Sequence, residues 1–213
     1  MGMSVARVTW YFDFISPYAY LQSTHLDALA NDAEIECVPV LFAGLLNHWG
    51  QKGPAEVAPK KIFSFRQCVW RAHEEGIDFH TPPKHPFNPL RVLRLAIALG
   101  NDRAIVQKIF RCIWVDGNLP DDDAGWAAIQ ETLGVDDGDE LTADAQVKAQ
   151  LLRNGEAAVA AGVFGVPTCR VGVEVFWGAD CLDMVCDYLE HPEMFDDDDM
   201  RRINTLMPSA ERY

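Results

Sequence analysis

Hydrophobic and polar positions follow a strand-like pattern and then a helix-like pattern at the start of the chain. Residues 5–14 are rich in β-branched and aromatic side chains, and Ser16-Pro17 follows them. Because serine is a preferred N-cap and proline is favoured at the first helical position, this order predicts a strand that runs into a helix over residues 18–30. Alternation within residues 34–41 predicts a second strand. The two strands would be parallel, with a right-handed crossover.

The middle of the chain has helical periodicity instead. Glycines and prolines predict that residues 42–59 are a turn-rich segment, and four prolines make residues 81–89 a constrained loop. The remaining hydrophobic positions recur at helical spacing. The predicted helices are residues 60–76, 90–99, 103–114, 123–133 and 143–164.

Strand patterns return only near the end of the chain. Residues 167–171 and 173–177 flank Gly172 and predict a hairpin, and residues 180–190 predict a helix. Because the strands lie at the two ends, the helical block is interpreted as an insertion in one α/β fold. We expect an α/β domain of residues 1–44 and 162–213 and an inserted all-helical domain of residues 45–161. The last stretch, from residue 196, is expected to be a weakly held tail.

Composition and charge narrow the classes of partner. The chain has 213 residues, 49% of them hydrophobic, and a net charge of −14. This charge argues against nucleic acid as a partner, because phosphate binding needs a basic surface. No hydrophobic run is long enough to span a bilayer and no signal-peptide pattern is present, so a cytoplasmic protein without membrane partners is expected. The acidic runs at 121–123 and 196–199 are interpreted as solvated segments, and no metal site is expected.

The chain has six cysteines, spread over predicted strands and helices. They are Cys37, Cys68, Cys112, Cys169, Cys181 and Cys186. None forms the C-x-x-C pair of a redox enzyme or a zinc site. We expect buried hydrophobic fillers in a reducing compartment.

Ser16 is the first candidate for chemistry. Its hydroxyl would lie at the amino end of a helix, where free N–H groups and the helix dipole favour an anion such as a thiolate. Ser-Pro is also an ordinary helix start, so a purely structural role stays open. Val166-Pro167 precedes the predicted hairpin, as the cis-proline of the thioredoxin fold does, facing the active-site helix. A trans proline that opens an edge strand is the alternative.

Four stretches in this order carry a resemblance to a known family. They are FDFISPYAYL from Phe12, LLNHWGQKGPAE from Leu45, HPFNPL from His85, and FGVPT with FWGAD from Phe164 and Phe176. The sequence resembles the 2-hydroxychromene-2-carboxylate isomerases and the kappa-class glutathione transferases, which are thioredoxin-fold enzymes with a helical insertion. Ser16-Pro17-Tyr18-Ala19 stands where a disulfide oxidase of this fold has two cysteines. The resemblance therefore implies that dithiol chemistry is lost there.

The resemblance implies glutathione as cofactor and assigns residues to it. Ser16 would donate a hydrogen bond to the glutathione sulfur, which lowers a thiol pKa. The backbone of Val166 would pair with the cysteinyl backbone, as an added strand does. The γ-glutamyl end would be held by Trp177, Gly178, Ala179 and Asp180. For Asp180, a plain N-cap of the last helix is the alternative.

The turn after the second predicted strand is also expected to contact glutathione. The glycine and proline frame places Gln51 at one such position and Lys60 near another. Asn47 is a departure, because the family often has a lysine there. Lys52 is close enough in sequence to replace it, although a solvated surface role is the alternative.

The proline-braced loop is expected to line the substrate pocket. His85, Phe87 and Asn88 offer one aromatic and two hydrogen-bonding side chains, which suits a flat aromatic acid. The structural alternatives are Phe87 in the core and His85 bonded to a neighbouring backbone. Trp49 would stack on the substrate or belong to the core.

The resemblance implies a glutathione-dependent isomerase in aromatic compound catabolism. It would interconvert a chromene carboxylate and a trans-o-hydroxybenzylidenepyruvate-like acid through a glutathione thiolate adduct. Its partner would be a small aromatic acid or electrophile, and the protein would be a homodimer. One alternative is a kappa-class-like transferase that consumes glutathione. The other is a non-catalytic thioredoxin-fold binding protein, which Asn47 and the acidic surface favour.

Overall fold

A four-stranded sheet forms the centre of the computed structural model, which describes residues 5–29 and 33–210. The strand order is β2-β1-β3-β4. Strand β1 (Ala6–Phe12) runs parallel to β2 (Ala33–Pro39) and antiparallel to β3 (Thr168–Val171). Strand β4 (Glu174–Trp177) forms a hairpin with β3. The parallel pair and the hairpin are confirmed.

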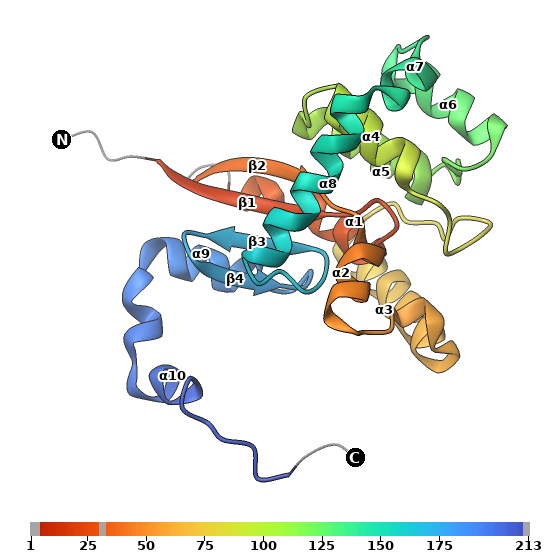
Figure 1. The fold of residues 1–213 in the computed structure, drawn as a ribbon. Helices are drawn as coiled ribbons and strands as arrows, with labels where there is room; N and C mark the ends of the chain where they lie inside the picture. The colour runs from red at the N-terminus through yellow and green to blue at the C-terminus, as the bar shows by residue number, and fades with distance from the viewer. Residues whose placement is uncertain (1–4, 30–32, 211–213) are drawn as a thin grey trace.

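Most of the helices follow β2 and precede β3 in the chain, and they pack around the sheet (Figure 1). In chain order they are α1 (Pro17–Ser23), α2 (Phe42–Trp49), α3 (Ala58–Glu75), α4 (Leu90–Ala98), α5 (Arg103–Trp114), α6 (Asp123–Leu133), α7 (Gly138–Ala143), α8 (Ala145–Ala160), α9 (Leu182–Glu190) and α10 (Asp198–Ile203). Short 3-10 turns cover Leu26–Ala28, Pro54–Glu56 and Pro192–Asp196. A thioredoxin-like α/β fold with helices inserted between its strands is therefore confirmed.

The two faces of β1 are covered differently. Val8, Trp10 and Phe12 are fully buried on one face. The rings of Trp10 and Phe12 lie 6.2 and 5.7 Å from Phe110 of α5, so the core continues from the sheet into the helical block. Helix α8 crosses the opposite face (Figure 1). The predicted domain bounds, 1–44 with 162–213 and 45–161, remain a prediction.

The turn-rich segment predicted over residues 42–59 is wrong at its start, because α2 occupies Phe42–Trp49. Its hydrophobic residues recur at helical spacing, and Leu45 is buried. Gly50 does not interrupt this helix but ends it, with φ at 62° in the left-handed region where glycine is unstrained. A Cβ added to Gly44 would meet no atom within 4 Å, so packing does not require glycine at this position.

Other element ends also differ from the prediction. The helix predicted over residues 18–30 ends at Ser23, and its predicted last residue lies outside the described chain. Helix α7 precedes α8, which ends at Ala160, and the predicted tail contains α10. Helix α9 has Cys181 as its N-cap, so Asp180 is not the cap.

The six cysteines are free thiols. Five are buried, as expected, and Cys186 is partly exposed. Within the described chain, no helix is both long and hydrophobic enough to cross a membrane. Among the same residues, no group of three or more histidine, cysteine and acidic side chains is placed to hold a metal ion.

Candidate active site

Ser16 forms the turn between β1 and α1. Its backbone is extended, its N–H donates to the carbonyl of Asp13 at 3.0 Å, and its side chain is the N-cap of α1. The Ser16 Oγ accepts the N–H of Ala19 at 3.2 Å. No acceptor for the hydroxyl proton is found among the described residues. The turn therefore leaves one hydroxyl proton free to be donated to a ligand.

Asp13 lies beneath this turn and is fully buried. Its Oδ1 accepts the N–H of Ile15 at 3.1 Å, and its Oδ2 accepts the N–H of Phe42 at 2.8 Å. Burial raises the pKa of Asp13 to about 7, and these two hydrogen bonds oppose the shift. The carboxyl ties the Ser16 turn to the start of α2. The sequence shows Asp13 as a single acid in a hydrophobic strand, which is the signal that could have singled it out.

The Val166–Pro167 peptide bond is cis, as the sequence predicts. Tyr11 pairs with Thr168, so this peptide lies at the end of the sheet from which β1 leads to Ser16. Among the described residues, neither the N–H nor the carbonyl of Val166 has a hydrogen-bond partner. A free donor and a free acceptor on one residue are what a peptide-like ligand needs to add as a short strand.

The segment after β4 is anchored to α1 through Gln22, which is fully buried. The Gln22 Nε2 donates to the carbonyl of Gly178 at 2.7 Å, and Trp10 Nε1 donates to Gln22 Oε1 at 2.7 Å. Gly178 in turn donates its N–H to the carbonyl of Pro167 at 3.0 Å. The structure thus brings the predicted γ-glutamyl segment next to the cis-proline. Gln22 was missed because its partner lies 156 residues away.

Within this segment, Ala179 is buried, whereas Asp180 and Trp177 are exposed. The Trp177 ring lies 5.2 Å from the ring of Phe164 and covers Gly165. A Cβ on Gly165 would lie 2.6 Å from Trp177 Nε1. The absence of a side chain at Gly165, just before the cis Val166–Pro167 peptide, therefore allows Trp177 to lie against this loop.

Replacing Gly165 with alanine is expected to displace the Trp177 indole and weaken glutathione binding by about tenfold, because overpacking typically costs 1–3 kcal/mol. Calorimetric titration with glutathione measures the effect. Gly155→Ala in α8 is the matched control, because its Cβ would meet nothing within 4 Å. Equal binding by the two variants would contradict a contact between Trp177 and glutathione.

The loop before α4 brings His85 to the Ser16 turn. The His85 Nε2 donates to the carbonyl of Ile15 at 2.9 Å, so the predicted alternative of a backbone contact is confirmed. The ring of Phe65 lies 5.0 Å from the imidazole. Burial lowers the pKa of His85. Its Nδ1 is buried and has no partner within the described chain, so His85 is a neutral histidine that holds the turn in place.

The other predicted substrate residues lie in different surroundings. Phe87 is 5% exposed and belongs to the core. The Asn88 Oδ1 accepts the N–H of Leu90 at 3.0 Å, which is a local structural contact. Asn47 is exposed on α2, and Trp49 is 43% exposed while its Nε1 donates to the carbonyl of Val163. A substrate contact by each of these residues stays a prediction.

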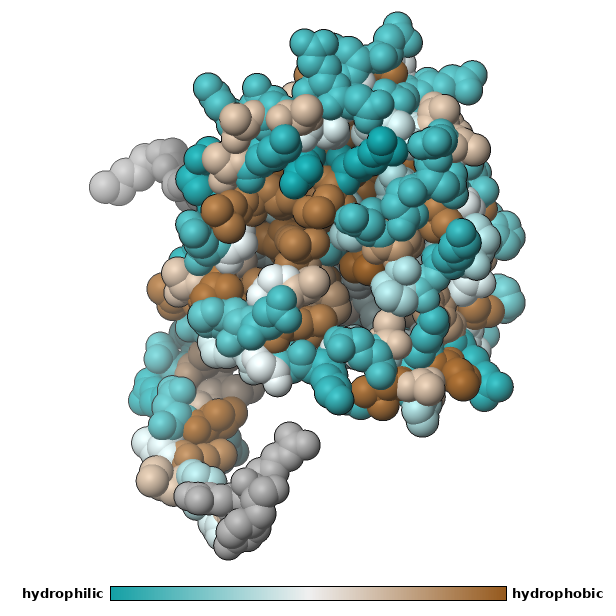
Figure 2. All heavy atoms as spheres, turned by 45° about the vertical axis from the view of Figure 1, so that its right-hand side comes forward, coloured by the Kyte–Doolittle hydropathy of each residue, from teal (hydrophilic) through white to brown (hydrophobic). Residues whose placement is uncertain are grey.

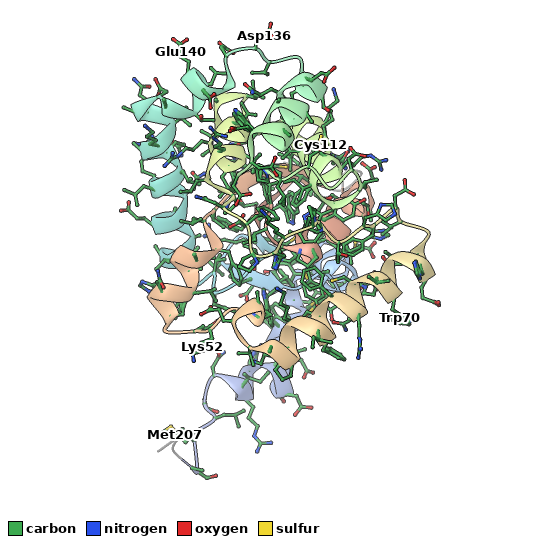
Figure 3. All side chains as sticks on the ribbon, turned by 90° about the vertical axis from the view of Figure 1, so that its right-hand side faces the viewer. Lys52, Trp70, Cys112, Asp136, Glu140 and Met207 are labelled. Carbon is green, nitrogen blue, oxygen red and sulfur yellow. The ribbon has the colours of Figure 1, made fainter. Side chains whose placement is uncertain are left out.

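The lysines predicted near glutathione, Lys52 and Lys60, lie in the loop after α2 and in the first turn of α3. Lys60 lines a cavity of about 310 Å³ with Pro54, Pro59, Phe63 and Ser64. Lys52 is exposed in the loop after α2, near the surface in Figure 3, and Gln51 beside it is exposed too. Lys61, which the sequence did not single out, donates to the carbonyl of His85 at 2.6 Å. The structure thus connects Lys61 to the Ser16 turn through His85.

Lys61→Met is expected to weaken glutathione binding by roughly 5- to 10-fold. The variant would lose a partly exposed ion pair between Lys61 and a carboxylate of glutathione, and such a pair contributes about 1 kcal/mol. The loss should shrink as salt is added. Lys60→Met is the matched control, because Lys60 is one residue earlier, is exposed and lines the cavity with Pro54 and Phe63. A stronger effect at Lys60 than at Lys61, measured by calorimetry, would reverse this assignment.

Figure 2 shows hydrophobic side chains gathered in a hollow on the face that comes forward, with hydrophilic side chains around it. Aromatic side chains contribute to the exposed hydrophobic surface of the molecule, and they include Trp49, Phe63, Trp70, Phe164 and Trp177. In Figure 3, Trp70 projects from the outer side of α3. A hydrophobic hollow with a polar rim is typical of small-molecule sites.

Comparison with known proteins assigns the fold and the family. The family model for a DsbA-like thioredoxin domain matches residues 7–190. A 2-hydroxychromene-2-carboxylate isomerase from Sphingobium xenophagum is 30% identical over 191 residues, which cover 85% of this chain and 97% of that protein. The chain is a member of the 2-hydroxychromene-2-carboxylate isomerase family within the DsbA-like thioredoxin proteins.

Two further relatives agree with this membership. A glutathione S-transferase kappa 2 from Caenorhabditis elegans is 25% identical over 207 residues, covering 87% of this chain and 92% of the relative. A solved 2-hydroxychromene-2-carboxylate isomerase superposes with a TM-score of 0.75 and 25% identity, covering 93% of this chain and 98% of that one. The isomerase family and the kappa-class transferases are therefore both relatives along nearly the whole chain.

The Ser16 turn of this family member contains no cysteine. Ser16 and Ala19 occupy the two ends of the S-P-Y-A segment at the start of α1. Elsewhere in the chain, the thiols of Cys169 in β3 and Cys181 at the start of α9 are hydrogen-bonded to each other. Their mutual contact raises the pKa of Cys169 and lowers that of Cys181. The turn can thus stabilise a ligand's thiolate and cannot supply one.

Proposed function

We propose that the protein is a glutathione-dependent isomerase of the 2-hydroxychromene-2-carboxylate isomerase type. One observation carries the proposal: the Ser16 hydroxyl proton finds no acceptor in the described part of the chain, at a helix start that lacks both cysteines. A hydrogen bond from this hydroxyl would favour the ionised form of a bound thiol. The names of the relatives, both isomerases and a glutathione transferase, support the same chemistry.

The residues present fit glutathione. Val166 offers a free N–H and a free carbonyl to its cysteinyl backbone. Asp180 is exposed at the start of α9 and would accept from the γ-glutamyl ammonium. Lys61 would attract a carboxylate from the other side of the turn. When bound, glutathione supplies the thiolate that adds reversibly to the substrate.

In the reaction the protein would bind and orient glutathione and the substrate, and it would hold a proton on Ser16. Ser16 would keep its proton and donate it as a hydrogen bond, so that the sulfur stays ionised. His85 and Asp13 fix the backbone on either side of Ser16 and would keep the hydroxyl in place. Trp49 and Trp177, whose exposed rings lie beside the cis-proline loop, would pack against a flat aromatic ring.

A turnover experiment tests this proposal. The purified protein is mixed with 2-hydroxychromene-2-carboxylate and glutathione, and the absorbance change and the free thiol are followed together. The proposal predicts interconversion of the two acids, dependence on glutathione, and no net loss of thiol. Interconversion that is equally fast without glutathione would contradict the cofactor assignment.

A kappa-type glutathione transferase is the second candidate, and it is favoured by the 25% identity to glutathione S-transferase kappa 2 over nearly the whole of both chains. It uses the same site and differs in the fate of glutathione. In the same experiment, loss of one thiol for each molecule of aromatic electrophile consumed would indicate conjugation instead of isomerisation.

A further inference from the structure

A second cavity lies on the face of the sheet that α8 crosses, and it has a volume of about 460 Å³. Side chains that alternate along β1 form its floor, namely Arg7, Thr9 and Tyr11. Asn154 of α8 forms part of its wall. The cavity differs from the site at Ser16, because its lining includes neither Ser16 nor Val166, and Tyr11 alone reaches the end of β1 that leads to Ser16.

Arg170 of β3 enters this cavity beside Thr9. The two residues are partners in the antiparallel ladder, so their side chains lie on the same face. The Arg170 Nε is buried and has no hydrogen-bond partner among the residues that the structure describes. Within residues 5–29 and 33–210, no carboxylate forms an ion pair with Arg170. A buried guanidinium N–H without an acceptor is unfavourable, and a ligand that supplies one removes this penalty.

The carboxylate that lines this cavity already has a positively charged partner. Glu36 forms an ion pair with Arg7 at 2.8 Å and accepts a hydrogen bond from the Thr9 hydroxyl at 3.3 Å. The two arginines and the one carboxylate leave one positive charge in the cavity, although the chain as a whole carries −14. A local cationic cavity in an acidic protein is selective for a small anion over a cation.

From this geometry we infer that the cavity between β1, β3 and α8 is a second binding site, for a small molecule with a carboxylate or phosphate group. The planar guanidinium of Arg170 binds the oxyanion through two N–H groups, of which Nε–H is one. The Tyr11 ring forms part of the floor and packs against the body of the ligand. The site is independent of glutathione and of Ser16.

Nuclear magnetic resonance of the full chain tests the inference with two probes, inorganic phosphate and acetate. Arg170 is expected to show a saturable shift of its Nε–H signal with one or both probes, whereas exposed Arg66 of α3 does not. A response to phosphate alone identifies a phosphate site, and a response to acetate alone identifies a carboxylate site. If neither probe shifts the Arg170 signal at high millimolar concentration, the inference is wrong.

Two variants check that Arg170 carries the binding. Arg170→Met is expected to weaken binding of the responsive probe by at least tenfold. Arg170→Lys is expected to have a smaller effect, because lysine keeps the positive charge but loses the two parallel N–H donors of the guanidinium. Arg66→Met and Ser16→Ala should bind the probe as the parent does. Unchanged binding of the probe by folded Arg170→Met would overturn the assignment. If that variant does not fold, the Nε–H shift of Arg170 in the parent protein decides whether the site binds the probe.

Discussion

The Ser16→Ala variant is expected to hold glutathione with a thiol pKa about one to two pH units higher than the parent protein does. A hydrogen bond to a charged group contributes about 1.5–3 kcal/mol, and one pKa unit corresponds to about 1.4 kcal/mol. The hydroxyl proton of Ser16 has no acceptor among the described residues, so the thiolate is its expected partner. The ultraviolet absorbance of the thiolate, recorded across pH for the complex, measures the change.

Ser23→Ala is the matched control for this experiment. Ser23 belongs to the same helix, is 1% exposed and donates its hydroxyl to the carbonyl of Tyr20 at 2.6 Å. Its loss removes one buried hydroxyl from α1 without touching the turn. Because Ser16→Ala also loses an N-cap worth about 1 kcal/mol, circular dichroism should show that both variants are folded. Equal thiol pKa values in the two variants would contradict the role of Ser16.

The free energy of unfolding is expected to fall as pH rises, through the titration of Asp13. Its carboxyl has a pKa of about 7 when folded and 3.8 as the ordinary value, so the folded state holds the proton longer. The stabilisation that the Asp13 proton gives the folded state is fully present below about pH 4. It decreases by about 1.4 kcal/mol per pH unit between about pH 4 and pH 7, and it is lost above about pH 7. The total is roughly 4 kcal/mol.

Urea unfolding at several pH values compares the parent with Asp13→Asn. The variant should lack this slope, because an amide does not titrate. Asp123→Asn, at an exposed acid of α6, is the control and should keep the slope of the parent. Parallel curves for the parent and Asp13→Asn would show that the buried carboxyl does not hold a proton near neutral pH.

The features with local causes were predictable from the sequence. Ser16-Pro17 has the residue types of a helix start, and the structure has the strand, the cap and the helix there. The hairpin followed from two strand-like segments around Gly172, and the cis bond at Pro167 followed from the resemblance to the thioredoxin fold. The helical insertion followed from strands at both ends of the chain.

The features that depend on distant partners were not predictable. The hydrogen bond from Phe42 to Asp13 spans 29 residues, and no local pattern indicates it. Lys60 and Lys61 are identical in type and adjacent in sequence, and only the rotation of about 100° per helical residue directs one toward His85. Glycine at position 50 is ambiguous in sequence, because it ends a helix as readily as it forms a turn.

Calorimetric titration of glutathione into the parent protein at pH 7, in two buffers with different ionisation enthalpies, tests the central claim most directly. A free thiol has a pKa of about 8.5 and is mostly protonated at this pH. If the Ser16 turn binds glutathione as a thiolate, binding must release close to one proton per site, and Ser16→Ala must reduce that number. Binding without proton release, or no binding at millimolar glutathione, would contradict the account.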